Sequence, residues 1–331
     1  MADGSLLLAA DHRPAAVVTR PRIDIALVNN MPDAAVQATE RQFAGLIAEA
    51  ARDDFDVQLS LYTLPETPRG EQARAAMQER YAGAEALMAA GTDALIVTGA
   101  EPLAADLRDE PYWDALTGLV DWARTNTVSA VWSCLAAHAA VLHMDGIERQ
   151  RLPVKCSGVF TFERGADEGL TAGLPGLVRM PHSRKNGLAA ADLEAKGYRI
   201  LTRSPRAGVD IFTRRGQSLF VFLQGHPEYD ADSLMREYCR DVGRYLRGLQ
   251  GEYPQSPFGY FDGETERSFR ALAVRARGGR DPRLVSWASE IAAAAKPARP
   301  WRAHAVTLFR NWLELVAAGK MANARPHRAQ A

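Results

Sequence analysis

The sequence contains few cysteines and no long apolar segment. Its 331 residues include three cysteines, Cys134, Cys156 and Cys239, and no two of them stand at CxxC spacing. This scattered, odd-numbered set predicts neither a disulfide framework nor a zinc site, so we expect no metal and a reducing compartment. No run of about eighteen apolar residues occurs, and no membrane-spanning helix is expected. The sequence therefore predicts a cytoplasmic protein without a membrane partner.

The sequence also lacks an excess of either charge. Forty basic residues balance forty acidic ones, whereas domains that bind nucleic acid usually carry net positive charge. Glycine-rich phosphate loops of the Walker or dinucleotide type are absent as well. We therefore expect no nucleic-acid partner, although a local basic patch for a phosphorylated cofactor remains compatible with this balance.

The sequence does contain an alternation of apolar strands and amphipathic helices. Strands are predicted over residues 23–28, 55–62, 93–97, 128–132 and 219–223, with helices over 34–51, 71–90 and 113–125. Strands that form almost continuous apolar runs are typical of a parallel sheet covered on both faces. The sequence thus predicts a single α/β domain over residues 21–318, with a mostly parallel sheet flanked by helices.

Three segments depart from this pattern. Residues 1–20 show no periodicity and are expected to form a flexible lead-in. Residues 263–300 are rich in arginine, alanine and glycine, which predicts a helical or mobile insertion near the C-terminus. The alanine-rich residues 319–331 are expected to form a disordered tail.

Cys134 follows a predicted buried strand directly and precedes a predicted helix. A side chain on such a turn is exposed at the carboxyl edge of the sheet, and the N-terminal amides of the next helix favour a thiolate there. A free thiol is only a few per cent ionised at neutral pH, so an adjacent base would be needed. The glycines that often flank a nucleophile on such a turn are replaced by Trp132 and Ala136. A lone cysteine at a strand end is also typical of a small core residue.

His226 and Glu228 follow the end of the predicted strand 219–223. A histidine there can accept the proton of a thiol, and a carboxylate two residues later can orient the imidazole. The alternative is a loop histidine that caps a turn, with Glu228 at the start of the next helix. The functional interpretation gains support because the carboxyl edge of a doubly wound sheet is where ligands bind.

A third loop at the same edge contains Gly99 and Ala100. A turn of small residues can point a backbone N–H at an oxyanion, together with the N–H of Leu135 at the start of the helix after Cys134. The same residues are also typical of an ordinary loop between a strand and a helix.

Several motifs in this order resemble the homoserine O-acyltransferases of the succinyltransferase type. That family has the class I glutamine-amidotransferase-like fold, a flavodoxin-like arrangement. The matching stretches include Asn30-Met31-Pro32, Thr98-Gly99-Ala100, Lys155-Cys156-Ser157-Gly158-Val159, Pro181-His182-Ser183-Arg184, Gly225-His226-Pro227-Glu228-Tyr229-Asp230, Arg240-Asp241 and Trp301-Arg302 with His304. The His-Pro-Glu element is shared with glutaminases, but the set as a whole is specific to the family.

The resemblance implies a cysteine–histidine–glutamate triad that transfers an acyl group by a ping-pong mechanism. Cys134 would be the acyl-thioester nucleophile, His226 the proton acceptor and Glu228 its orienting partner. The acyl donor would be acyl-CoA as a co-substrate, the acceptor homoserine in methionine biosynthesis, and no cofactor would be permanently bound. The family also implies a homodimer.

The resemblance further implies that Lys155, Ser183 and Arg240 contact the substrate. An amino-acid substrate needs a cation for its carboxylate and polar partners for its ammonium group, although a surface ion pair or a turn hydroxyl would account for the same residues. In the family, one position is glycine or glutamate, and its identity correlates with whether the donor is succinyl or acetyl. That position is Leu103 here, so the acyl donor stays open.

Three alternatives remain from the sequence. Another hydroxy amino acid, such as serine, could replace homoserine as the acceptor. A glutaminase of the amidotransferase type would use the same triad, but it would not need the Pro-His-Ser-Arg motif. A non-catalytic binding protein on the same fold is the third alternative.

Overall fold

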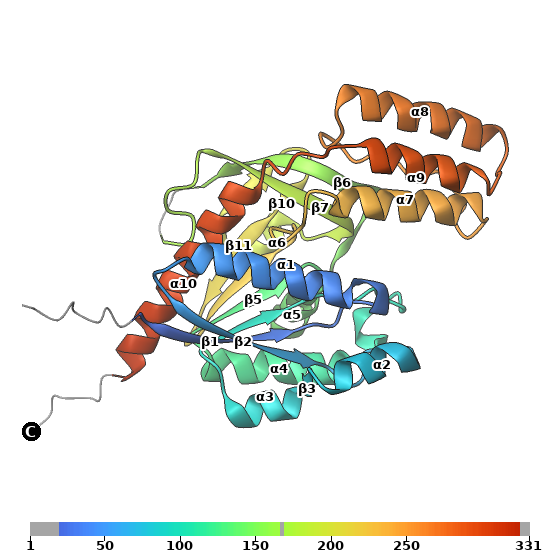
Figure 1. The fold of residues 1–331 in the computed structure, drawn as a ribbon. Helices are drawn as coiled ribbons and strands as arrows, with labels where there is room; N and C mark the ends of the chain where they lie inside the picture. Colours follow the sequence, from blue (N-terminus) through green and yellow to red (C-terminus); the bar gives the residue numbers. More distant parts are fainter. Residues whose placement is uncertain (1–19, 166–168, 325–331) are drawn as a thin grey trace, which may run out of the picture.

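A computed structural model describes residues 20–165 and 169–324, and it confirms the predicted fold class (Figure 1). One eight-stranded sheet has helices on both faces. Its strands, in spatial order, are β3 (Ala82–Gly83), β2 (Asp56–Thr63), β1 (Arg22–Val28), β4 (Ala94–Val97), β5 (Ser129–Ser133), β12 (Leu219–Leu223), β11 (Ile211–Arg215) and β8 (Arg199–Ile200). Residues 1–19 of the predicted lead-in lie outside the described residues.

The strands from β3 to β12 pair in parallel. At one edge of the sheet, β11 pairs antiparallel with β12, and β8 pairs antiparallel with β11. The neighbouring strands β4, β5 and β12 end at the same edge, since Val97 pairs with Trp132 and Ser133 pairs with Leu223. The three loops singled out in the sequence therefore leave the sheet side by side.

Helices cover each face of this sheet because its central strands are apolar on both sides. The named helices on the two faces and around the sheet are α1 (Asp33–Ala51), α2 (Glu71–Gln78), α3 (Ala84–Ala90), α4 (Trp113–Asn126), α5 (Leu135–Asp145), α6 (Ala190–Ala195) and α10 (Arg302–Ala324), with a short 3₁₀ turn at Leu107–Asp109. One buried cluster joins α1 and α10 to the sheet, and another joins α3, α4, α5 and α6 to the opposite face. In the part of the chain that the structure describes, no helix is long and apolar enough to cross a membrane.

The helix α10 corrects the predicted tail. It continues to Ala324, so residues 319–324 are helical rather than disordered, and residues 325–331 lie outside the described part. Lys320 explains part of this, because its Nζ lies 2.5 Å from Asp93 Oδ2 and 3.0 Å from the Arg22 carbonyl oxygen. Alanine is also the strongest helix former.

A second, antiparallel sheet was not predicted. Its strands, in spatial order, are β10 (Gly208–Val209), β9 (Thr202–Ser204), β6 (Gln150–Arg164) and β7 (Leu177–Gly187). Phe160 and Phe162 of β6, with Val178 and Met180 of β7, pack into the same core as α1 and α10. This sheet carries two of the predicted substrate contacts, Lys155 and Ser183.

The inserted segment 263–300 forms two helices, α8 (Gly263–Gly278) and α9 (Leu284–Ala294), beside α7 (Ser233–Leu246). The Asp262 carboxylate caps α8 by accepting hydrogen bonds from the N–H groups of Glu264 and Thr265. A cluster of buried apolar residues joins the three helices, and Figure 1 shows them stacked to one side of the main sheet.

Candidate active site

Cys134 occupies the turn between β5 and α5 in a conformation that is rare for residues other than glycine. Its φ is +52° and its ψ is −109°, which costs on the order of 1–3 kcal/mol and is typical of residues held by the surrounding structure. The Cys134 N–H donates to the Leu223 carbonyl oxygen at 2.7 Å, which fixes the turn to β12. The half-buried thiol thus lies at the sheet edge without the flanking glycines that such turns often contain.

His226 and Glu228 form a buried pair beside this turn. His226 Nδ1 lies 2.9 Å from Glu228 Oε1, and the ring stacks on Tyr229 with centroids 4.3 Å apart. Burial acts to lower the pKa of His226, but the Glu228 charge and a hydrogen bond with the Cys134 side chain raise this pKa well above its ordinary value. A proton on the imidazole is therefore stabilised by the Glu228 carboxylate. The three residues expected to form a triad are brought together.

The loop after β4 lies directly against the start of α5. A Cβ on Gly99 would lie 3.0 Å from Leu135 N and 2.9 Å from Leu135 Cβ, so only a glycine permits this approach. The Leu135 N–H belongs to the first turn of α5, whose N–H groups have no partner within the helix. The predicted oxyanion residues Gly99, Ala100 and Leu135 are therefore neighbours, and their role stays a prediction.

The three predicted substrate contacts converge on two acidic residues of α7. The Ser183 hydroxyl donates to Glu237 Oε2, and Lys155 Nζ lies 2.8 Å from Asp241 Oδ2 and 3.9 Å from Glu237 Oε2. Arg240 donates to Asp241 Oδ1 at 3.0 Å. Burial acts to raise the pKa of Asp241, but the two cations hold this pKa below its usual range.

Tyr229 connects this polar cluster to the predicted triad. Its ring stacks on His226, and its hydroxyl donates to Glu237 Oε1 at 2.5 Å. Burial and the charge of Glu237 raise the pKa of Tyr229 well above its ordinary value, so the hydroxyl stays protonated and keeps donating. Neither Tyr229 nor Glu237 was predicted to act at the site. The spacing of Glu237 and Asp241, four residues apart and thus on one face of a helix, was a signal that could have found the acidic cluster.

Leu103 lies on the loop between β4 and the 3₁₀ turn. Its side chain is 72% exposed, and its N–H donates to Glu110 Oε1 at 2.7 Å. The neighbouring Glu101 reaches Arg244 of α7 at 3.4 Å, so this loop is tied to the helix that carries the acidic cluster. The predicted effect of Leu103 on the acyl donor stays a prediction.

A buried group of residues supports the His226 loop from behind. Asp210 Oδ1 accepts a hydrogen bond from the Gly225 N–H at 2.9 Å and lies 3.3 Å from His182 Nε2. Arg184 Nε donates to His182 Nδ1 at 3.3 Å. Burial lowers the pKa of His182, which keeps this ring neutral between the aromatic rings of Phe160 and Phe162.

The fold and this cluster define a class of protein: an α/β protein that holds a cysteine, a histidine and a glutamate together at the carboxyl ends of parallel strands. Comparison with known proteins identifies the family. The family model described as homoserine O-succinyltransferase matches residues 5–322. The chain belongs to the homoserine O-succinyltransferase family.

Individual relatives agree with this family. The chain is 52% identical over 291 residues to a homoserine O-succinyltransferase of Rhodopseudomonas palustris, covering 88% of this chain and 87% of the relative. It is 49% identical over 298 residues to one of Bradyrhizobium japonicum, covering 90% and 91%. Among solved structures, a glutamine amidotransferase of Thermotoga maritima matches with a TM-score of 0.43 at 13% identity, over 83% of this chain and 99% of that one.

Proposed function

We propose that this protein transfers an acyl group, with succinyl as the favoured group, from acyl-CoA to the side-chain hydroxyl of homoserine. The observation that carries the proposal is the strained Cys134 turn beside the buried His226–Glu228 pair. The family and the names of its members support homoserine as the acceptor and succinyl as the acyl group. The reaction would be a step in methionine biosynthesis.

In the first half-reaction, Cys134 would give its proton to His226 and attack the thioester carbonyl carbon of the donor. The raised pKa of His226 supports this transfer. The oxyanion would lie between the Leu135 N–H and an amide of the Gly99–Ala100 loop, where each lost donor typically costs about 10²–10³ in rate. The carbon–sulfur bond to CoA then breaks, the proton on His226 passes to the CoA sulfur, and an acyl-thioester on Cys134 remains.

In the second half-reaction, His226 would accept the proton of the homoserine hydroxyl while its oxygen attacks the acyl-thioester. The bond to Cys134 breaks, and the thiolate regains a proton from His226. Glu228 would hold the ring in position and stabilise the imidazolium in both halves.

The polar cluster on α7 suits a zwitterionic amino acid. Lys155 and Arg240 are cations that could bind the carboxylate, and Glu237 is an anion that could bind the ammonium group. In the structure Lys155 forms ion pairs with Asp241 and Glu237, and Arg240 forms one with Asp241. Their place beside His226, through Tyr229, supports an acceptor whose hydroxyl reaches the triad while its charged end stays on α7.

The experiment is intact-protein mass spectrometry after mixing the enzyme separately with succinyl-CoA and acetyl-CoA without an acceptor. We expect one acyl adduct on Cys134, formed faster from succinyl-CoA. Addition of homoserine should remove the adduct, whereas serine should leave it. Removal by serine but not by homoserine would name another acceptor.

A matched pair of cysteine variants makes the result decisive. Cys134→Ala should form no adduct, and Cys239→Ala should form it normally, because burial raises the pKa of the Cys239 thiol to about 11. An adduct that persists in Cys134→Ala, or none from either donor in the wild type, would overturn the mechanism.

A further inference from the structure

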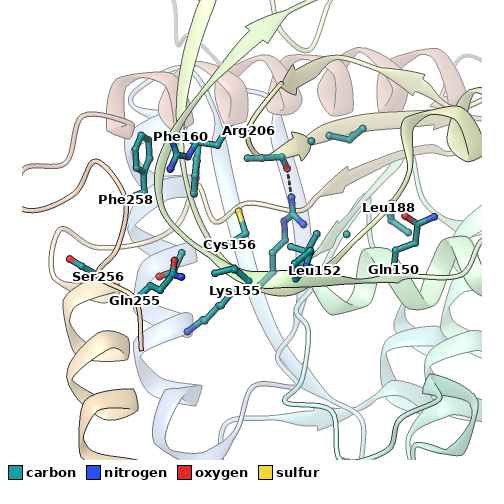
Figure 2. Close-up of a pocket in the computed structure, with 18 residues that line it drawn as sticks. Gln150, Leu152, Lys155, Cys156, Phe160, Leu188, Arg206, Gln255, Ser256 and Phe258 are labelled. Carbon is teal, nitrogen blue, oxygen red and sulfur yellow. Dashed lines mark hydrogen bonds between the residues drawn. The ribbon is translucent and has the colours of Figure 1, made fainter. Parts of the chain in front are cut away.

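A cavity of about 480 Å³ lies beside the polar cluster formed by Lys155, Ser183, Glu237, Arg240 and Asp241. It is lined by the first half of β6, the end of β7, the turn between β9 and β10, and residues 255–258 (Figure 2). Its volume is within the range of small-molecule sites. Neither the predicted triad nor Glu237 belongs to its lining, so it is a separate feature of the molecule.

The lining of this cavity is cationic. Lys155, Arg184 and Arg206 contribute to it, and none of the eighteen lining residues is an aspartate or glutamate. This contrasts with the whole sequence, in which the two charges balance. A cavity that collects positive charge without carboxylates favours an anionic ligand.

Arg206 is the cation best placed to meet such a ligand. Its guanidinium lies 3.9 Å from the ring centroid of Phe258, and Phe258 itself stacks on Phe160 with centroids 5.3 Å apart. Among the described residues, no carboxylate forms an ion pair with Arg206. Figure 2 shows Phe160, Phe258 and Arg206 grouped at one end of the cavity. A guanidinium placed over a ring presents positive charge beside an aromatic surface, which suits phosphates and a nucleobase.

Arg184 adds a fixed positive charge inside the cavity. Its guanidinium donates to the carbonyl oxygens of Asn186 and Ala207 and to His182 Nδ1, all of which are uncharged acceptors. Only 6% of Arg184 is exposed. The charge is therefore held in place before any ligand arrives.

Lys155 connects the cavity to the polar cluster, because it lines the cavity while its Nζ bonds Asp241 on α7. We propose that this cavity binds the phosphorylated nucleotide end of the acyl donor, and this assignment rests on the proposed function. The pantetheine arm would then pass Lys155 toward Cys134. Gln255 at the cavity supplies a neutral hydrogen-bonding group for the base or the ribose, and the Ser256 hydroxyl, which donates to Glu266 Oε2 at 2.8 Å, can still accept a hydrogen bond.

Binding by the full chain tests the site without any turnover. Adenosine 3′,5′-bisphosphate is the probe, and isothermal titration calorimetry is the readout. Arg206→Gln should weaken binding by at least about tenfold, because a charge-assisted contact is lost. Arg203→Gln is the matched control: Arg203 is an exposed residue of β9 outside the cavity lining, and its change should leave the affinity unaltered. Equal binding by wild type and Arg206→Gln would overturn the proposal.

Steady-state kinetics ties the site to the donor. Arg206→Gln should raise the KM for acyl-CoA by at least about tenfold, while kcat and the KM for homoserine stay unchanged. An unchanged donor KM in an active enzyme would overturn the assignment. Phe258→Leu should give the same pattern more weakly, and thermal unfolding checks that both variants are folded.

Two outcomes separate this site from the proposed function. If no acyl transfer is measurable but bisphosphate binding depends on Arg206, the nucleotide site stands and the proposed function fails. If ATP binds in an Arg206-dependent way and CoA does not displace it, the ligand is a free nucleotide and the assignment to the donor is overturned.

Discussion

The substitution Gly225→Ala tests how the His226 loop is held. A Cβ at this position would lie 2.7 Å from Met180 Cγ and 2.8 Å from both Asp210 Oδ1 and His182 Nε2. These three partners are buried, with exposed fractions of 0–1%. The φ of Gly225 is not in the left-handed region, so the effect is steric rather than conformational.

The expected change in stability combines two losses with one smaller gain. Inserting a methyl group into a packed interior costs about 1–3 kcal/mol. If Asp210 moves aside, the hydrogen bond from the Gly225 N–H to its carboxylate is lost, which costs about 1.5–3 kcal/mol. Alanine restores up to about 1 kcal/mol by restricting the unfolded chain. The net loss should be about 1.5–6 kcal/mol, a large part of an ordinary free energy of unfolding.

Urea unfolding of wild type, Gly225→Ala and Gly216→Ala measures this difference. Gly216 lies in the β11–β12 hairpin, where the nearest atom to an added Cβ is 3.8 Å away, so its change should stay within about 1 kcal/mol. Gly225→Ala should also lower the acyl-transfer rate, since the adjacent His226 shifts with the loop. A loss below about 1 kcal/mol with full activity would refute the reasoning.

Two further substitutions probe the site and its support. Glu228→Gln removes the charge that raises the pKa of His226, so alkylation of the nearby thiol by iodoacetamide should slow. The raised pKa of His226 in the folded state stabilises the fold below about pH 6.5. This stabilisation is lost as the pH rises through the raised pKa. The difference in unfolding free energy between wild type and Glu228→Gln should therefore shrink as the pH is raised, and a pH-independent difference would contradict the assignment. At Gly158, where φ is +140°, the Cβ of an alanine would overlap the backbone of Phe258. In Gly158→Ala, hydrogen exchange should therefore show residues 255–259 detached or the protein unfolded. Wild-type protection of residues 255–259 would disprove the close approach.

The parallel sheet and the residues at its edge could be predicted because their signals are local. The strands β1, β4, β5 and β12 are buried on both faces, and their apolar runs mark where each one ends. Parallel strands place their carboxyl ends at one edge, so the meeting of Cys134 and His226 follows from the strand ends alone. The rare φ of Cys134, by contrast, accompanies a backbone hydrogen bond to Leu223 of β12 and leaves no mark in the sequence.

The antiparallel sheet could not be predicted in the same way. Its strands β6 and β7 contain Pro153 and Pro181, which weaken a strand signal, and their register shifts between Arg151 and Cys156. One face of β6 points Lys155 at the carboxylates of α7 rather than at a core, so polar residues stand where alternation would need apolar ones. The wrong prediction that residues 319–324 are disordered has a similar origin, because a contact of α10 pairs Lys320 with a residue more than two hundred positions away.

The residues at the ends of the parallel strands and the predicted substrate contacts lie on different parts of this fold. Gly225 follows the end of a buried parallel strand, where an added Cβ over-packs the core. Lys155 and Glu237 lie on the antiparallel sheet and on α7, with side chains 24% and 22% exposed, where a change of charge leaves core volume unaltered. Substitutions of the first kind must therefore cost stability and rate together, whereas those of the second kind can alter substrate affinity at little cost to the fold. Gly225→Ala should therefore lower both stability and the acyl-transfer rate, whereas Arg206→Gln should weaken donor binding without lowering stability.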